Sequence, residues 1–217
     1  MKRQYDLVVF DWEGTLAEDS FGYVLSVIAK EATRMNLADF DKSRARQYMT
    51  YGLTTMISRL LPDLSMRQHE QFIQNIQDEL KRNPQEVCLM DGAAEVVKKI
   101  HDSGFKLAIA TNRSLKSLQR VLQLSNLEKY FPVIRTVSEA PPKPCPQMLE
   151  EILMESAAPV KRTVMIGDSV TDIEMARSIN VDAIGVDFYQ EQENILLEAG
   201  AKFVLRDYKG LLKYLEI

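Results

Sequence analysis

Short apolar segments with β-branched residues recur along the chain and are bounded by turn residues. Such segments are typical of buried strands. We expect strands at residues 7–10, 106–110, 133–136, 163–166, 183–186 and 203–205. Helical patterns separate most of them, at residues 93–101, 115–124, 147–156, 173–179 and 192–198. This alternation predicts an α/β fold in which a doubly wound parallel sheet is covered by helices on both faces.

The stretch from residue 17 to residue 84 departs from this alternation. It contains several helical patterns and no convincing strand. Met56, Ile57 and Leu60 fall on one helical face, and Phe72 and Ile76 fall on another. We therefore expect an α-helical domain inserted after the first strand, with residues 1–16 and 85–217 forming the α/β core.

Composition and charge narrow the range of partners. The 217 residues are 46% hydrophobic and 27% charged, which suits a soluble globular protein. A net charge of −4 provides no basic field for nucleic acid or for an anionic membrane. No apolar run has the length of a signal peptide or a membrane span, so we expect a cytoplasmic protein. Two cysteines, Cys88 and Cys145, form neither a disulfide framework nor a zinc-type spacing. The sequence leaves the oligomeric state open.

Polar residues that can carry chemistry follow several of the predicted strands. Asp11 follows the first strand, Thr111 the second, and Asp168 and Asp172 the fourth, while Lys143 lies in the loop beyond the third. Taken singly, each has a simpler explanation as a helix cap, a turn residue or a solvated lysine. Ligands of open parallel sheets bind beyond the carboxyl ends of the strands, so together these residues predict a site at that edge.

The order of these segments resembles a known family. The chain contains D-x-x-G-T-L at 11–16, T-N at 111–112, K-P at 143–144 and G-D-x-x-x-D at 167–172. This series resembles the haloacid dehalogenase-like hydrolase superfamily, in the subgroup with a helical cap inserted after the first motif. Within it, the chain is most similar to phosphoglycolate phosphatase-like members. The resemblance covers essentially the whole chain, including the position of the helical insert.

The resemblance implies a Mg²⁺-dependent phosphatase acting on a small phosphorylated metabolite, such as phosphoglycolate or a sugar phosphate. Asp11 would attack phosphorus and form an aspartyl-phosphate, and Glu13 would act as general acid and base. The metal site would comprise Asp11, the backbone carbonyl of Glu13, Asp168 and Asp172. The phosphate would be bound by backbone groups near Trp12 and by Thr111, Asn112 and Lys143. From its position directly after Thr111 and Asn112, Arg113 either contacts a substrate anion or is a solvated surface residue.

Glu13 departs from the family pattern, because phosphatases of this superfamily usually carry aspartate two positions after the nucleophile. The additional methylene displaces the proton donor by more than about 1 Å unless its conformation compensates. Two alternatives to a phosphatase follow: a phosphate- or metabolite-binding protein with weakened catalysis, and a phosphomutase. A dehalogenase lacks a carboxylate at this position. A phosphonatase has a small residue there and requires a cap lysine, for which Lys30 and Lys42 are candidates by location only.

Several further residues have two interpretations. Trp12 lines the substrate side of the first loop or packs beside it. Arg44, Arg46, Tyr51 and Arg59 of the insert contact the substrate or belong to a solvated helix face.

Overall fold

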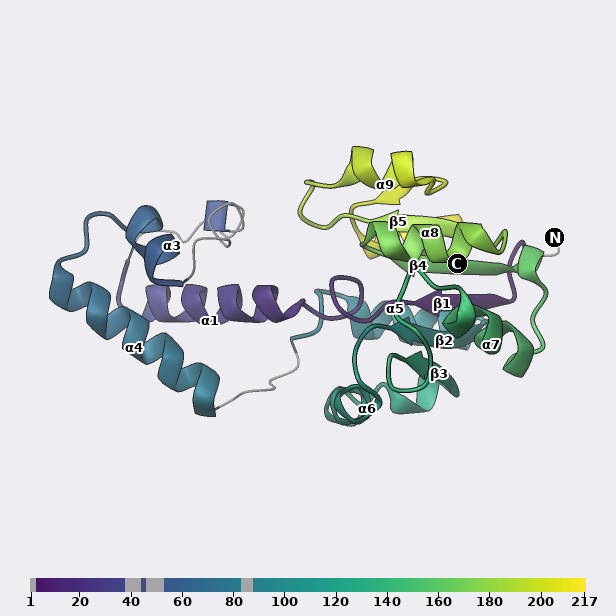
Figure 1. Cartoon of the computed structure of the whole chain (residues 1–217), viewed down its shortest axis with the longest axis horizontal. Helices are drawn as coiled ribbons and strands as arrows, with labels where there is room; N and C mark the ends of the chain where they lie inside the picture. Colours follow the sequence, from purple (N-terminus) through teal and green to yellow (C-terminus); the bar gives the residue numbers. More distant parts are fainter. Residues whose placement is uncertain (1–2, 38–43, 46–52, 83–87) are drawn as a thin grey trace. The chain divides into compact units, whose positions relative to one another are not determined.

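The computed structural model describes residues 3–37, 44–45, 53–82 and 88–217. The chain divides into two compact units (Figure 1). An α/β unit comprises Met1–Glu18 and Val87–Ile217, and a helical unit comprises Asp19–Glu86. Each is described separately below. Lys42, Arg46 and Tyr51 lie outside the described residues.

The α/β unit is built on a six-stranded parallel sheet with the strand order β3-β2-β1-β4-β5-β6. The strands are β1 (Leu7–Phe10), β2 (Lys106–Thr111), β3 (Val133–Thr136), β4 (Thr163–Gly167), β5 (Asp182–Val186) and β6 (Val204–Leu205). The chain first builds outward from β1 through β2 to β3, and then returns to build through β4 to β6. The switch point of this topology, where a ligand site is expected, lies between β1 and β4.

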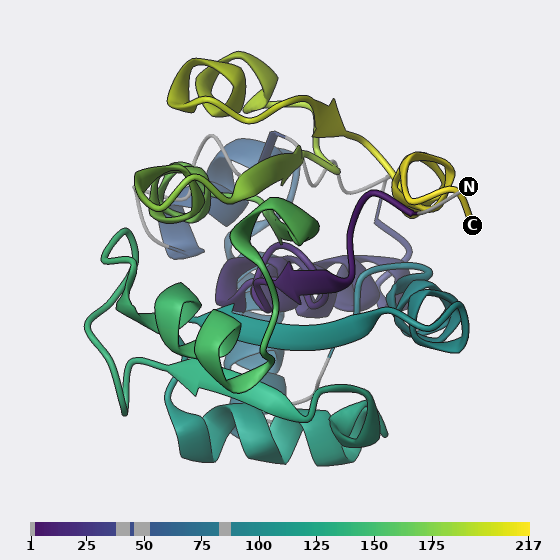
Figure 2. The same cartoon turned by 90° about the vertical axis from the view of Figure 1, so that its right-hand side faces the viewer.

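Helices cover both faces of the sheet (Figure 2). Val8 and Phe10 of β1 pack on the side of α5 (Ala93–Asp102), α6 (Leu115–Leu124) and α10 (Tyr208–Tyr214). Leu7 and Val9 pack on the side of α7 (Gln147–Glu155), α8 (Val170–Ser178) and α9 (Glu193–Ala199). Successive strand residues thus alternate between two apolar cores, so both faces of β1 are buried. The predicted doubly wound α/β fold is confirmed.

Two helices of this unit differ from the sequence-based expectation by more than one residue. The helix expected at residues 173–179 begins earlier, at Val170, because Ser169 and Asp172 form a capping box around its first turn. Helix α10 was not expected, although Asp207 caps it by accepting a hydrogen bond from the backbone N–H of Gly210. Its buried residues Tyr208 and Leu211 join the core beside β1.

The helical unit contains α1 (Ser20–Arg34), α3 (Leu53–Leu60) and α4 (Met66–Arg82) (Figure 1). It has an apolar core of its own. Leu25 and Ile28 of α1 are buried together with Ile57 of α3 and with Phe72 and Ile76 of α4. The division of the chain falls after Glu18 and after Glu86, two residues beyond each expected boundary. None of the described helices combines the length and the apolar composition of a bilayer-spanning segment.

Candidate active site

Three carboxylates converge beyond the carboxyl ends of β1 and β4. Asp11 follows β1 directly, Asp168 follows β4, and Asp172 lies in the first turn of α8. One oxygen from each of the three lies within 4.8 Å of the others. Asp11 is 7% exposed and Asp172 is fully buried, so two of these charges are almost entirely removed from water. Such a cluster requires compensating positive charge.

Lys143 supplies part of that charge. Its Nζ lies 2.6 Å from Oδ1 of Asp172 and 2.7 Å from Oδ1 of Asp11, and its side chain is 2% exposed. Burial opposes the charged form of this lysine, but the two carboxylates outweigh burial and raise its pKa above the usual range. The loop is tied to β2 by Asn112, whose Oδ1 accepts a hydrogen bond of 2.9 Å from the backbone N–H of Lys143. Asn112 thus positions the lysine loop.

The raised pKa values of the carboxylates indicate that one lysine does not neutralise the negative charge of the cluster. Burial is the largest cause of the raised pKa of Asp11, about 6, with Lys143 opposing it and Asp172 adding to it. Burial, followed by the charges of Asp11 and Asp172, raises the pKa of Asp168 to about 8. These carboxylates therefore favour a further cation beside them.

The donor set fits Mg²⁺. This ion prefers hard oxygen ligands and keeps part of its water shell, and carboxylates from different segments provide such ligands. Oδ1 of Asp11 is buried and, among the described residues, receives no hydrogen bond of acceptable geometry. That oxygen therefore has a lone pair for a metal ion in addition to its ion pair with Lys143. Two further contacts orient the other carboxylates: Thr15 Oγ1 donates to Asp168 Oδ1 at 3.2 Å, and Ser169 Oγ donates to Asp172 Oδ2 at 2.7 Å.

Gly14 permits the close approach of the first loop to Asp168. Its φ is +76°, and a Cβ atom placed there would lie 2.1 Å from Asp168 Oδ2. Any side chain at this position would strain the backbone and displace the carboxylate. The loop closes through a hydrogen bond of 2.7 Å from the Gly14 N–H to the Ala17 carbonyl.

The remaining candidates lie near the same edge, with distinct contacts. The Trp12 side chain is 1% exposed within the apolar core, so it packs beside the first loop. The Trp12 backbone favours the charged form of the Asp11 carboxylate and so opposes the rise of its pKa caused by burial. Thr111 is buried, and its Oγ1 accepts a hydrogen bond of 3.2 Å from the Arg113 N–H. Arg113 itself contacts Glu13, with 2.5 Å between Nη1 and Oε1.

Sequence reasoning gave no role to Thr15 or Ser169. Each lies beside a predicted residue: Thr15 follows Gly14 in the first motif, and Ser169 follows Asp168. The spacing of Ser169 and Asp172, serine followed three positions later by an acid, is a signal for a helix N-terminus. The contact of Thr15 with Asp168 joins residues 153 positions apart and has no such local signal.

A family model described as haloacid dehalogenase-like hydrolase matches residues 8–186, most of the α/β unit and the whole insert. The chain belongs to this family. The predicted resemblance is therefore confirmed, and the protein is an enzyme of the hydrolase class.

Two curated relatives and a solved structure illustrate the similarity. A phosphoglycolate phosphatase of Mesorhizobium japonicum is 27% identical over 194 residues, which cover 84% of this chain and 82% of the relative. The pyrophosphatase PpaX of Halalkalibacterium halodurans is 31% identical over 123 residues, covering 56% of this chain and 57% of the relative. A hydrolase of the same family from Deinococcus radiodurans, crystallised with bound phosphate and sodium, superimposes with a TM-score of 0.69 at 21% identity, covering 98% of this chain and 97% of that one.

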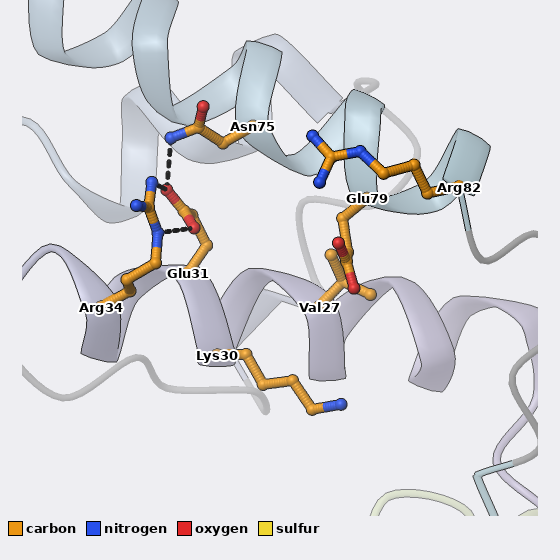
Figure 3. A pocket seen from close by; sticks show the side chains of 7 residues that line it. All are labelled: Val27, Lys30, Glu31, Arg34, Asn75, Glu79 and Arg82. Atoms are coloured by element: carbon orange, nitrogen blue, oxygen red, sulfur yellow. Dashed lines mark hydrogen bonds and ion pairs between the residues drawn. The ribbon is translucent and has the colours of Figure 1, made fainter.

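The helical unit contains a separate cluster of charged residues (Figure 3). A cavity of about 400 Å³ lies between α1 and α4. Glu31 in this cavity accepts hydrogen bonds from both Arg34 and Asn75. The cavity is lined by Val27, Lys30, Glu31, Arg34, Asn75, Glu79 and Arg82. Of the insert residues considered for substrate contact, Arg44 and Arg59 are described and belong to this unit.

Proposed function

We propose that this protein is a Mg²⁺-dependent phosphatase that hydrolyses a small phosphomonoester through an aspartyl-phosphate on Asp11. The convergence of Asp11, Asp168, Asp172 and Lys143 beside the topological switch point carries this proposal. Membership of the hydrolase family and the name of the Mesorhizobium relative support it.

In the first step, a carboxylate oxygen of Asp11 attacks phosphorus and the bond from phosphorus to the ester oxygen breaks. Glu13 donates its proton to that leaving oxygen, so an alcohol departs and Asp11 carries the phosphoryl group. In the second step, Glu13 accepts a proton from water, and the oxygen of that water attacks phosphorus. The bond between phosphorus and the Asp11 oxygen breaks, which releases inorganic phosphate and restores the carboxylate.

Mg²⁺ would be held by Asp11, Asp168 and the backbone carbonyl of Glu13, with Asp172 supporting the shell. When bound, the ion neutralises phosphoryl charge and reduces the repulsion between phosphate and the attacking carboxylate. Lys143 would bind a phosphoryl oxygen while it holds Asp11 and Asp172 in place. Thr111 and the backbone N–H groups of the first loop would donate to the remaining phosphoryl oxygens.

We propose that the substrate is a phosphoglycolate-like or sugar phosphate and that the helical unit acts as a cap that selects it. The relatives' names include both phosphoglycolate phosphatase and pyrophosphatase, so a panel of phosphorylated metabolites is the appropriate screen. A phosphomutase would use the same aspartyl-phosphate, but it would isomerise its substrate without releasing inorganic phosphate.

The decisive test is the replacement Asp11→Asn. The wild-type protein should release p-nitrophenol from p-nitrophenyl phosphate with Mg²⁺ and not with EDTA, and Asp11→Asn should reduce the rate to background. Asp102→Asn, at the exposed end of α5, is the matched control and should retain the wild-type rate. Undiminished turnover in Asp11→Asn would overturn the assignment. Phosphate-analogue binding without turnover in the wild type would favour the binding-protein alternative.

A further inference from the structure

An ion pair with Arg113 holds Glu13. Nη1 of Arg113 lies 2.5 Å from Oε1 of Glu13. The Glu13 side chain is 36% exposed and that of Arg113 is 21% exposed, so the pair lies at the edge of the site with partial access to water. The two residues are 100 positions apart in the sequence.

Both ends of this contact are anchored. On the arginine side, Nε donates to Ser117 Oγ at 2.8 Å, and the Arg113 backbone N–H donates to Thr111 Oγ1. On the glutamate side, the first loop is closed by hydrogen bonds from the N–H groups of Leu16 and Ala17 to the carbonyl of Trp12. The guanidinium therefore bridges two fixed segments, the loop after β1 and the start of α6.

We propose that Arg113 is a positioning residue that holds the longer Glu13 side chain where the acid and base of this reaction must lie. The proposal rests on the proposed phosphatase function and deepens it. Family phosphatases usually have aspartate at this position, and the glutamate side chain is longer by one methylene and has one more rotatable bond. Arg113 and Ser117 restrict the conformations of that longer side chain.

The geometry of the pair is compatible with proton transfer. The contact engages Oε1 of Glu13 and leaves Oε2 outside it, so the second oxygen can exchange a proton with the leaving group or with water. Fixing a flexible carboxyl group in a productive orientation raises the rate, because little conformational freedom is then lost in the transition state. An unanchored glutamate would sample several rotamers.

The first experiment compares Arg113→Met on two leaving groups. An alkyl phosphate, the best found in the metabolite panel, requires a proton on its departing oxygen, whereas p-nitrophenolate leaves without one. We expect kcat/KM, which reports the formation of the aspartyl-phosphate, to fall roughly 10- to 100-fold on the alkyl phosphate and less than about threefold on p-nitrophenyl phosphate. Hydrolysis of the aspartyl-phosphate, for which Glu13 is the base, is common to both substrates and should slow equally for both. Arg120→Met, at an exposed arginine of the adjoining helix α6, is the matched control and should resemble the wild type.

The second experiment tests whether Arg113 acts through Glu13. In a Glu13→Gln background, Arg113→Met should have almost no additional effect, because the group it positions is absent. In a Glu13→Asp background, the shorter acid has less freedom to be restrained, so Glu13→Asp/Arg113→Met should recover much of the alkyl phosphatase rate that Arg113→Met loses.

Three results would overturn the proposal. A large rise in KM with kcat retained would assign Arg113 to substrate binding. Equal losses of kcat/KM on both substrates, persisting in the Glu13→Gln background, would show an effect independent of Glu13. A higher kcat in Arg113→Met would show that the ion pair with Arg113 hinders proton transfer by Glu13. Failure of the phosphatase assignment itself is distinguished by the wild-type and Asp11→Asn rates on p-nitrophenyl phosphate.

Discussion

The two units each contain a cluster of charged side chains, but the carboxylates of the two clusters are stabilised to different extents by their neighbours. In the α/β unit, Asp11 and Asp172 share one buried lysine, and the pKa of Asp168 is raised to about 8. In the helical unit, Glu31 is bound by Arg34 and Asn75, and the pKa of Glu31 is lowered, chiefly by its hydrogen bond to Arg34 (Figure 3). The direction of the carboxyl pKa thus differs between the two clusters.

This difference separates a site arranged for chemistry from a structural contact. Buried like charges reduce stability, so a fold keeps them where they bind something that is not part of the chain. A carboxylate surrounded by its own donors needs no further ligand. The raised carboxyl pKa values support the proposed catalytic role of the carboxyl edge of β1 and β4, and the lowered pKa of Glu31 supports a packing role for its contact.

The largest expected effect on stability is that of Lys143→Met. This change leaves Asp11 and Asp172 buried without their shared cation, and breaking a buried ion pair in this way costs about 3–5 kcal/mol. Urea unfolding at pH 8 without metal should show the loss. Lys202→Met removes a partly exposed lysine that pairs with Asp182 and is the control, with a much smaller effect expected. Equal stability of Lys143→Met and the wild type would remove the distinction between the two clusters.

Asp168→Asn should change function and stability in opposite directions. Removing one carboxylate relieves repulsion, so the metal-free variant should unfold at a higher temperature than the metal-free wild type. Added Mg²⁺ should raise the unfolding temperature of the wild type but not that of the variant, because binding to the folded state alone stabilises it. Turnover should fall on the order of 100-fold or more.

Differential scanning calorimetry with EDTA and with Mg²⁺ measures both halves of this prediction. Asp102→Asn should respond to Mg²⁺ like the wild type. An unchanged Mg²⁺ response in Asp168→Asn would contradict a metal site at this edge.

Most of the sheet could be predicted from the sequence, because buried parallel strands are short apolar runs between turn residues. Strands β1 and β3 have the expected bounds. The two-residue strand β6 is shorter than expected, and α10 was missed, although Asp207 and the apolar positions after it are a recognisable helix signal.

Some features of the candidate site could likewise be predicted from the sequence, and others could not. The strand-end rule gathers Asp11 and Asp168, because sheet topology alone places the ends of β1 and β4 side by side. Lys143 was expected at the same edge, but its contacts with Asp11 and Asp172 depend on the reach of its loop and side chain. Contacts that depend on side-chain reach could not be predicted. The ion pair between Arg113 and Glu13 has no local sequence pattern. The hydrogen bond from the Lys143 N–H to Asn112 has none either, and the sequence predicted Asn112 as a phosphate ligand instead.

The smallest effect should come from Glu31→Gln in the helical unit. Glutamine can still accept a hydrogen bond from Asn75 but loses the charge that pairs with Arg34, whose side chain is 65% exposed. Partly exposed ion pairs stabilise proteins weakly, so the unfolding temperature at pH 7 should fall by only about 1–2 °C, with turnover unchanged. A loss of turnover would contradict the packing role.

The pH dependence of that small difference tests its electrostatic origin. The folded-state pKa of Glu31 lies below the unfolded value of about 4.3. The stabilisation is therefore fully present above that unfolded value and is lost as the pH falls through the lower folded pKa. Wild type and Glu31→Gln should consequently differ at pH 7 and converge in acid. A difference that persists unchanged in acid would assign the effect to packing of the glutamate, since a charge-dependent contact cannot survive its protonation.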